Sequence, residues 1–436
     1  MGKRVIVGCF IVLMLTPISV AAVPSGAGKA SITTTTAFQM EWNRTFGGIE
    51  GDSASSLIRT TDGGFVLAGE TDSYGTGNFD FWLVKTNSSG YAEWNSTFGG
   101  AEWDVANSVI QTADGGYALA GHSGYPDPNF WLVKTDASGQ HEWNSTIVGG
   151  IKWDGANSVI QTADGGFALA GYNGSFPEGD MWLVKTDASG QHVWNTTFGG
   201  PEWERADSVI QTADGGFALA GETGTDPLSD FWLVKTDASG QHEWNKTYDG
   251  GALDSAKSMI QTADGGFALA GEAAGETGTD PVSDFWLVKT DASGQHEWNK
   301  TYDGGMLDAA RSVIQTADGG FALAGHTYSH DVAGGNIDIW LVKTDANGQM
   351  EWAKTFGGPA DDAANSVVQT PDGAIVLAGE TESYGAGATD MWLIKIIESE
   401  TTTTTTPTEA SPSWTPIISI FSLMALVIFR KRIRHR

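Results

Sequence analysis

An acidic residue recurs about every 50 residues along this chain. The seven positions are Asp52, Asp104, Asp154, Glu204, Asp254, Asp308 and Asp362. Carboxylates gathered at one mouth of a repeated fold could attract Ca²⁺, which prefers oxygen ligands. They could instead accept hydrogen bonds from the backbone of nearby turns. Because a local site would break the symmetry of the repeat, recurrence in every unit favours the hydrogen bond, and we assign no metal ligands.

Three tryptophans share one position in consecutive units, directly before the first expected strand. They are Trp103, Trp153 and Trp203, whereas the other units carry Gly, Leu or Asp there. Indoles on neighbouring units could form a stacking surface for sugars or an apolar partner. We therefore take them as candidate ligand-binding residues. The alternative that each indole packs beneath its own loop stays open.

Catalytic chemistry has little support in the sequence. The single cysteine, Cys9, lies in an apolar N-terminal run, so thiol catalysis, disulfides and zinc–thiolate sites are excluded from the rest of the chain. Glycoside hydrolysis needs two carboxylates about 5 to 10 Å apart. Glu178 and Asp226 are acidic loop candidates, but no pair stands out. We assign no catalytic residue and no cofactor.

Other polar residues recur too regularly to indicate a local site. Lys85 has an equivalent in each of the six other units, and four histidines are copies within one turn: His141, His192, His242 and His296. We interpret both sets as structural.

Eight asparagines precede X-Ser/Thr and are candidate glycosylation sites. They are Asn43, Asn87, Asn95, Asn144, Asn173, Asn195, Asn245 and Asn299. Most of them lie in a repeated Trp-Asn-X-Thr of the expected outermost strand. Glycan along that edge is compatible with a secreted protein; simple repetition of the unit explains the pattern equally well.

The charge excludes one class of partner. The chain has 24 Lys+Arg against 53 Asp+Glu, a formal net charge of -29. Binding of nucleic acid needs a basic surface, so we expect no nucleic-acid partner. Such acidity fits a solvated exterior, a high-salt habitat or attraction of cations.

Three markers each occur seven times. They are a tryptophan that opens the unit (Trp42 is the first), an Asp-Gly turn (Asp62) and a run such as Asp80-Phe-Trp-Leu-Val-Lys85. A period near 50 residues indicates a solenoid or a propeller. Turn signals divide the second unit into four strands, expected at 104–112, 117–122, 130–135 and 140–146. The sequence therefore predicts an all-β, seven-bladed β-propeller of four-stranded blades.

The phase of the repeat predicts how the ring closes. The first element, 39–46, matches a fourth strand, and the last unit stops after its third strand near Ile396. The N-terminal strand can complete the last blade and remove an open sheet edge. In each blade, the short turns after strands one and three share one face, and the variable loops after strands two and four share the other. We expect any binding site on the variable face.

Both ends of the chain resemble targeting segments. Residues 1–22 have the basic start, apolar run and small residues of a signal peptide. The propeller is expected at 38–397, a Thr/Pro-rich stalk at 398–413, a transmembrane or sorting segment at 414–429 and a basic cytoplasmic tail at 430–436. These segments predict a propeller held outside the cell membrane.

The segment from Trp244 to Glu272 resembles bacterial and archaeal cell-surface β-propeller repeats, with its Gly-Gly, Asp and Asp-Gly turn in that order. A weaker likeness links Asp237-Ala-Ser-Gly240…Trp244 to quinoprotein propeller repeats, which usually have eight blades and a quinone with Ca²⁺. No ligand set for that cofactor can be placed here. The first resemblance implies a surface propeller and says little about activity.

Together these patterns predict a non-catalytic binding or adhesion module at the cell surface. We expect a monomeric ring whose variable loops face an extracellular glycan or protein. The alternatives are an extracellular glycoside hydrolase or lyase and a structural component of a surface layer. Fold alone does not decide among them.

Overall fold

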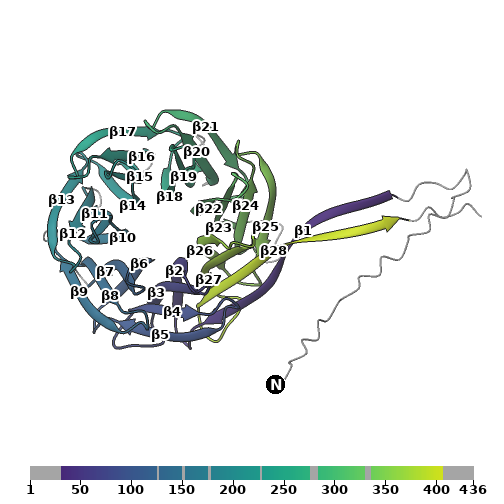
Figure 1. Cartoon of the computed structure of the whole chain (residues 1–436), viewed down its shortest axis with the longest axis horizontal. Helices are drawn as coiled ribbons and strands as arrows, with labels where there is room; N and C mark the ends of the chain where they lie inside the picture. Colours follow the sequence, from purple (N-terminus) through teal and green to yellow (C-terminus); the bar gives the residue numbers. More distant parts are fainter. Residues whose placement is uncertain are drawn as a thin grey trace, which may run out of the picture. The chain divides into compact units, whose positions relative to one another are not determined.

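The computed structural model describes residues 31–124, 127–149, 153–174, 178–225, 228–274, 283–328 and 335–405. These residues form 28 strands and no helix. The strands make seven sheets of four antiparallel strands, arranged in a ring (Figure 1). The predicted seven-bladed β-propeller is therefore confirmed.

Each blade runs from an inner strand near the ring axis to an outer strand. Blade 1 is β2 (Asp52–Arg59), β3 (Phe65–Thr71), β4 (Asp80–Thr86) and β5 (Ala92–Phe98); blade 2 is β6 (Asp104–Gln111), β7 (Tyr117–Ser123), β8 (Asn129–Thr135) and β9 (His141–Ile147); blade 3 is β10 (Asp154–Gln161), β11 (Phe167–Asn173), β12 (Asp180–Thr186) and β13 (His192–Phe198). Blade 4 is β14 (Trp203–Gln211), β15 (Phe217–Thr225), β16 (Leu228–Thr236) and β17 (His242–Tyr248); blade 5 is β18 (Asp254–Gln261), β19 (Phe267–Ala274), β20 (Ser283–Thr290) and β21 (His296–Tyr302). Blade 6 is β22 (Asp308–Gln315), β23 (Phe321–Tyr328), β24 (Ile337–Thr344) and β25 (Met350–Phe356); blade 7 is β26 (Asp362–Gln369), β27 (Ile375–Thr381), β28 (Asp390–Thr405) and β1 (Ser31–Phe46).

The middle strands form because their apolar side chains are buried on both faces between neighbouring blades. Phe130 and Trp182, from the third strands of blades 2 and 3, lie 4.5 Å apart between ring centroids, and the pair Phe231–Trp286 repeats this contact at 4.4 Å. Such rings bury large apolar areas and favour tilted packing. The core is thus a series of interblade clusters rather than one central core.

A second set of contacts joins the inner strands. The serine hydroxyl oxygen in each inner strand accepts a hydrogen bond from the backbone N–H of the next blade, as from Val109 to Ser56 at 3.2 Å. Leu57 N donates to Ser366 Oγ at 3.1 Å and so completes the circle between blades 7 and 1. The repeat therefore places one serine–backbone hydrogen bond at every blade interface.

The N-terminal strand closes the ring as predicted. β1 lies beside β28 in the order β1-β28-β27-β26 (Figure 1). Phe38 stacks on Trp352 at 3.9 Å between centroids, and Glu41 pairs with Lys395 at 2.9 Å. Five of the other six blades make the same Lys–Glu pair within one continuous segment, so the closing strand reproduces the local chemistry of a fourth strand.

Both closing strands run further than the sequence suggested. β1 begins at Ser31 rather than at 39, and β28 continues to Thr405, into the expected stalk. Runs of β-branched threonine favour extended backbone there. Phe38–Glu398 form the ring unit, and residues 31–37 and 399–405 belong to a separate unit.

The predicted signal peptide 1–22, the segment 414–429 and the tail 430–436 lie outside the described residues. Within the part of the chain that is described, no helix is long and apolar enough to cross a membrane.

Candidate functional site

The two ends of the blades form two chemically different faces. The hairpin turns after the first and third strands lie on one face, which we call the turn face. The loops after the second and fourth strands form the loop face, where Asp104 N donates to Phe79 O of the preceding blade at 2.8 Å. Chain segments about 25 residues apart therefore meet on the loop face, and at the closing interface Asp52 N makes the equivalent bond to Thr389 O, from the far end of the chain.

On the turn face, a buried or nearly buried lysine pairs with the aspartate of its blade's turn, and in every blade except blade 3 it also pairs with a glutamate of the outer strand. Lys134 is 4% exposed, and its Nζ lies 2.9 Å from Asp114 Oδ2 and 2.9 Å from Glu142 Oε2. It also donates to Thr135 O at 2.8 Å. Burial opposes ionisation of Asp114, yet hydrogen bonds from Lys134 and Thr112 hold the pKa of that carboxyl at about 2. These contacts support the structural role expected for the Lys85 set.

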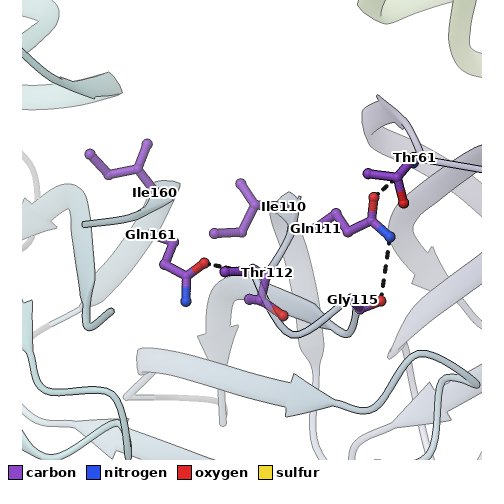
Figure 2. A pocket seen from close by; sticks show the side chains of 8 residues that line it. Thr61, Ile110, Gln111, Thr112, Gly115, Ile160 and Gln161 are labelled. Carbon is purple, nitrogen blue, oxygen red and sulfur yellow. Dashed lines mark hydrogen bonds between the residues drawn. The ribbon is translucent and has the colours of Figure 1, made fainter. Parts of the chain in front are cut away.

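The inner part of the turn face is a chain of glutamine bridges. Figure 2 shows the Gln111 amide between Thr61 and Gly115: its Oε1 accepts from Thr61 N at 2.9 Å and its Nε2 donates to Gly115 O at 3.3 Å. Gln161 repeats the first bond to Ala113. The hollow of about 620 Å³ bounded by these residues is thus lined by a structural repeat whose polar groups already have partners.

Exposed apolar side chains gather on the loop face. Among the described residues, twelve large hydrophobic side chains are exposed. Nine lie at the loop-face ends of the blades: Ile49, Tyr74, Trp103, Val148, Trp153, Leu228, Leu253, Leu307 and Tyr384. Only Tyr91 lies in a turn-face hairpin, while Val193 and Met350 lie in outer strands. Exposed apolar surface rimmed by polar groups is typical of interaction sites.

The three candidate tryptophans lie on this loop face in unequal environments. Trp103 is 48% exposed and meets Phe79 edge-on, with centroids 5.7 Å apart. Trp153 is 45% exposed. Trp203 is half-buried; it packs on Tyr172 at 5.4 Å, and its Nε1 donates to Glu222 Oε1 at 3.2 Å. Ligand binding by the three tryptophans stays a prediction. Trp103 and Trp153 are the main candidates, because their rings are the more exposed.

The recurring acids accept backbone hydrogen bonds, as the sequence favoured. Oδ2 of Asp104 accepts from Gly100 N at 2.9 Å, and the equivalent bond recurs at all seven positions. The sequence analysis missed a second acid that faces the first across most interfaces. It opens the third strand of the preceding blade, as Asp80 does opposite Asp104, and this neighbour adds to the effect of burial in raising the pKa of Asp80.

An ion-pair network near the ring axis was also missed. Arg205 Nε lies 3.1 Å from Asp207 Oδ2 and 3.4 Å from Glu222 Oε1. In the next blade, Lys257 donates to Ser255 Oγ at 2.7 Å and lies 3.7 Å from Glu272. A cavity of about 250 Å³ is lined by Glu222, Lys257 and Glu272 together with Leu253 and Leu307.

A signal for this network was present in the sequence. Most inner strands carry Ser or Asn where blades 4, 5 and 6 carry Asp207, Lys257 and Arg311. Burial lowers the pKa of Lys257, and the charge of Asp207 raises the pKa of Arg205. Blades 4, 5 and 6 thus carry charged side chains at a position that is uncharged in the other blades.

Two glutamates lie in the next two blades around the ring. Glu70 in β3 and Glu380 in β27 hold the same position in neighbouring blades. Burial, reinforced by the charge of Glu380, raises the pKa of Glu70 to about 7. Glu380 lines a cavity of about 310 Å³ with Arg311 and His326. Of the carboxylates that the sequence suggested for catalysis, Glu178 is exposed in a loop and Asp226 lies outside the described residues.

The candidate glycosylation sites divide by exposure. Asn43, Asn95, Asn144, Asn195, Asn245 and Asn299 are exposed on outer strands, whereas Asn87 and Asn173 are half-buried. Each of the four repeated histidines lies 2.8 to 3.0 Å from the Nδ2 of one of these asparagines, as His141 does from Asn144. Glycosylation itself stays a prediction.

No family model matches the chain, and no curated protein matches it in sequence. Solved structures match at low identity. Sqt1 from Chaetomium thermophilum is 14% identical, with a TM-score of 0.46 over 79% of this chain and 83% of that one. The periplasmic gluconolactonase PpgL from Pseudomonas aeruginosa is 13% identical (TM-score 0.48; 71% and 87% covered), and the polysaccharide lyase Uly1 is 11% identical (0.46; 80% and 90%). Similarity at this level bears on no ligand or activity, and the expected surface origin stays a prediction.

Proposed function

We propose that this propeller is a non-catalytic binding module that holds an extracellular glycan or protein on its loop face. The observation that carries the proposal is the gathering of nine of the twelve exposed large hydrophobic side chains on that face. On the turn face, by contrast, hydrogen bonds and ion pairs within the chain occupy the polar groups. Aromatic rings beside carboxylates suit sugars, because a sugar offers apolar C–H faces and hydroxyl donors.

The place of action is part of the same proposal. A signal peptide at 1–22 and a membrane or sorting segment at 414–429 would put the ring outside the cell, held near the membrane. This supports a ligand on the cell's exterior, such as an envelope polysaccharide or a neighbouring surface protein.

The test is retention of the full-length protein on a glycan array and a panel of extracellular proteins. Trp153→Ala should weaken binding at least tenfold, since the loss of one well-packed aromatic contact costs about 1.4 kcal/mol or more. The melting temperature of the variant is measured beside its retention, because Trp153 is 45% exposed and its loss also removes contacts within the chain. Tyr91→Ala, which removes an exposed ring from the turn face, is the matched control. Equal retention of parent and Trp153→Ala would contradict the proposal.

A second candidate function has one observation in its favour. Glu70, whose pKa is raised to about 7, and Glu380, whose pKa burial also raises, lie in neighbouring blades, and glycoside hydrolysis could use such a pair as acid and base. Turnover of the retained glycan by the parent, abolished in Glu70→Gln, would replace the binding proposal with a hydrolase.

A further inference from the structure

The paired acids of the loop face accept hydrogen bonds from protein groups at several interfaces. At the interface of blades 1 and 2, Asp80 Oδ2 accepts from Thr76 N at 2.6 Å, and Asp104 Oδ2 accepts from Gly100 N. At the interface of blades 7 and 1, Asp52 accepts from the hydroxyl of Thr71 and from Ser73 Oγ. These groups stabilise part of the buried negative charge, although Asp80 Oδ1 is buried without a hydrogen-bond partner.

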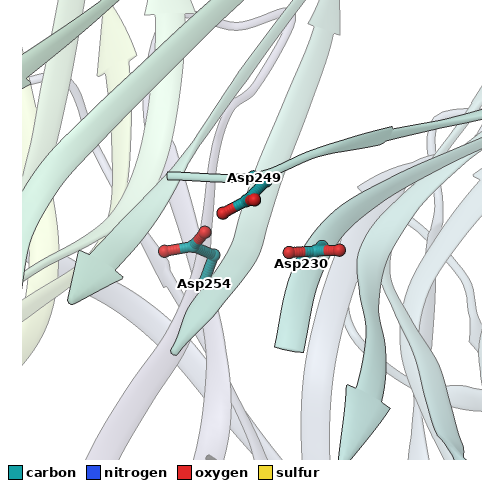
Figure 3. A group of neighbouring side chains, drawn as sticks. All are labelled: Asp230, Asp249 and Asp254. Atoms are coloured by element: carbon teal, nitrogen blue, oxygen red, sulfur yellow. The ribbon is translucent and has the colours of Figure 1, made fainter. Parts of the chain in front are cut away.

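The interface of blades 4 and 5 adds a third acid. Asp249 takes the place that a glycine holds at four other interfaces, as Gly99 does. A Cβ at Gly99 would come 1.8 Å from Asp80 Oδ1, so no side chain fits there without rearrangement. Here the backbone accommodates one. Asp230 from β16, Asp249 after β17 and Asp254 at the start of β18 bring one carboxylate oxygen each to within 4.8 Å of one another (Figure 3). We call these three residues the 4/5 cluster.

The same interface has lost a donor. Asp254 pairs in register with Ala273, whereas Asp52 and Asp362 pair with Thr71 and Thr381, whose hydroxyls donate to their Oδ1 atoms. As a result Asp254, which is 0% exposed, has an Oδ1 that is buried with no hydrogen-bond partner. Its Oδ2 accepts from Gly250 N at 2.5 Å. A buried carboxylate oxygen without a partner is costly unless a proton, a hydrogen-bond donor or a cation neutralises it, and Asp80 Oδ1 and Asp338 Oδ1 share this condition elsewhere in the ring.

No basic side chain supplies that charge. Among the described residues, no lysine or arginine forms an ion pair with a member of the 4/5 cluster. Asp249, the outermost member, is exposed, so an ion can enter from solvent.

The interface of blades 5 and 6 repeats the arrangement. Asp284, Asp303 and Asp308 also bring one oxygen each to within 4.8 Å, and we call them the 5/6 cluster. Asp284 Oδ1 is buried without a hydrogen-bond partner. Two neighbouring interfaces thus share a third acid, whereas the lost hydroxyl is specific to the first, because Asp308 pairs in register with Thr327.

We propose that the 4/5 cluster binds a calcium ion and that the 5/6 cluster binds a second. The donor set consists of hard carboxylate oxygens without nitrogen or sulfur, which suits Ca²⁺ or Mg²⁺ rather than Zn²⁺. A separation of up to 4.8 Å equals two Ca–O bonds of about 2.4 Å across one ion, whereas Mg–O bonds of about 2.1 Å need a tighter set. Water at the exposed side of Asp249 would complete the coordination. The ion would join the ends of β16, β17 and β18 on the loop face.

The test uses the full-length protein, stripped with EGTA. Calorimetric titration with CaCl₂ should show two ions per chain, with a Kd on the order of 10⁻⁴ M, as in extracellular modules. Tb³⁺ should bind in place of Ca²⁺ and luminesce on indole excitation, because Trp286 Cε2 lies 3.2 Å from the Cβ position of Gly250. Calcium should also raise the melting temperature.

Variants assign the sites. Asp249→Gly, the residue that other interfaces carry, should reduce the stoichiometry to one ion, and Asp249→Gly with Asp303→Gly should abolish binding. Asp249→Asn keeps the side-chain volume and should weaken the 4/5 site at least tenfold if the glycine variant unfolds. Asp72→Asn, an exposed acid of the same face, is the control. A parent that binds no calcium, or a double variant that still binds two ions, would overturn the proposal.

Discussion

Aspartates on the two faces of this ring have opposite electrostatic environments. Asp114 on the turn face lies beside the Lys134 ammonium, and its pKa falls to about 2 despite some burial. Burial raises the pKa of Asp254 on the loop face to about 6, and the charges of Asp230 and Asp249 add to this shift. Aspartates therefore stabilise the turn face through ion pairs, whereas on the loop face the buried negative charge of Asp254 has no such partner among the described residues. Structural roles belong to the first face, and ligand binding is expected on the second.

The largest expected effect comes from removing the cation of the turn face. Lys134→Met should lower the free energy of unfolding by about 3 kcal/mol, because three short bonds to a buried ammonium are lost and Asp114 and Glu142 keep their charges. Urea unfolding at pH 7 measures this. Lys246→Met, in outer strand β17, is the control. Equal stability of the two variants would show that the lysine contacts of the turn face do not stabilise the fold.

Measuring stability against pH tests whether burial also raises the pKa of a loop-face acid near the ring axis, Glu70. The folded-state pKa of Glu70, about 7, exceeds its ordinary value of 4.5, so the folded protein binds the proton more tightly. The resulting stability is present below pH 4.5 and is lost as pH rises through 7, by about 3 kcal/mol.

Glu70→Gln should remove that loss, since its amide stays neutral. The measurement is the difference in unfolding free energy between parent and variant at pH 5 and pH 8, with Glu50→Gln as an exposed control. A difference that does not change with pH would show that Glu70 ionises normally.

One substitution made on both faces should have opposite signs. Asp114→Asn loses an ion pair that is exposed on one side and should destabilise by about 1 kcal/mol. Asp338→Asn should stabilise by about 1 kcal/mol at pH 7, because burial and the charges of Asp362 and Asp361 raise the pKa of Asp338 to about 6. Asn129 already occupies the equivalent position in blade 2. Melting curves of both variants at pH 7 check the signs; a shared sign would mean that the faces do not differ in this respect.

Much of the fold could be predicted from the sequence, because a propeller is the repetition of a local unit. The Asp-Gly turns, the alternation of short apolar runs and the out-of-phase ends are all local patterns. For the second unit, the expected strands agree with β6 to β9 to within about a residue at each end. The exception is the Thr-rich ends, where β-branched composition extended β1 and β28 beyond the expected bounds.

The candidate site was only partly predictable. The sequence indicated the loop face, and the hydrogen bonds of the recurring acids were predicted correctly from their recurrence. It placed the three tryptophans together as one class, although Trp203 is half-buried against Tyr172. Whether an indole faces solvent depends on the ring that packs against it from a neighbouring segment.

The sequence by itself determined seven four-stranded blades and the chemistry that each repeats, because strand periodicity and turn residues act over a few positions. Only the tertiary structure decided which residues of different blades meet. Asp230 and Asp254 are separated in sequence by a whole outer strand and its flanking loop. Asp249, which follows β17, is the third residue at their interface. The burial of charge at this interface and the lack of a hydroxyl at Ala273 depend on contacts between units, so the sequence of a single unit does not reveal them.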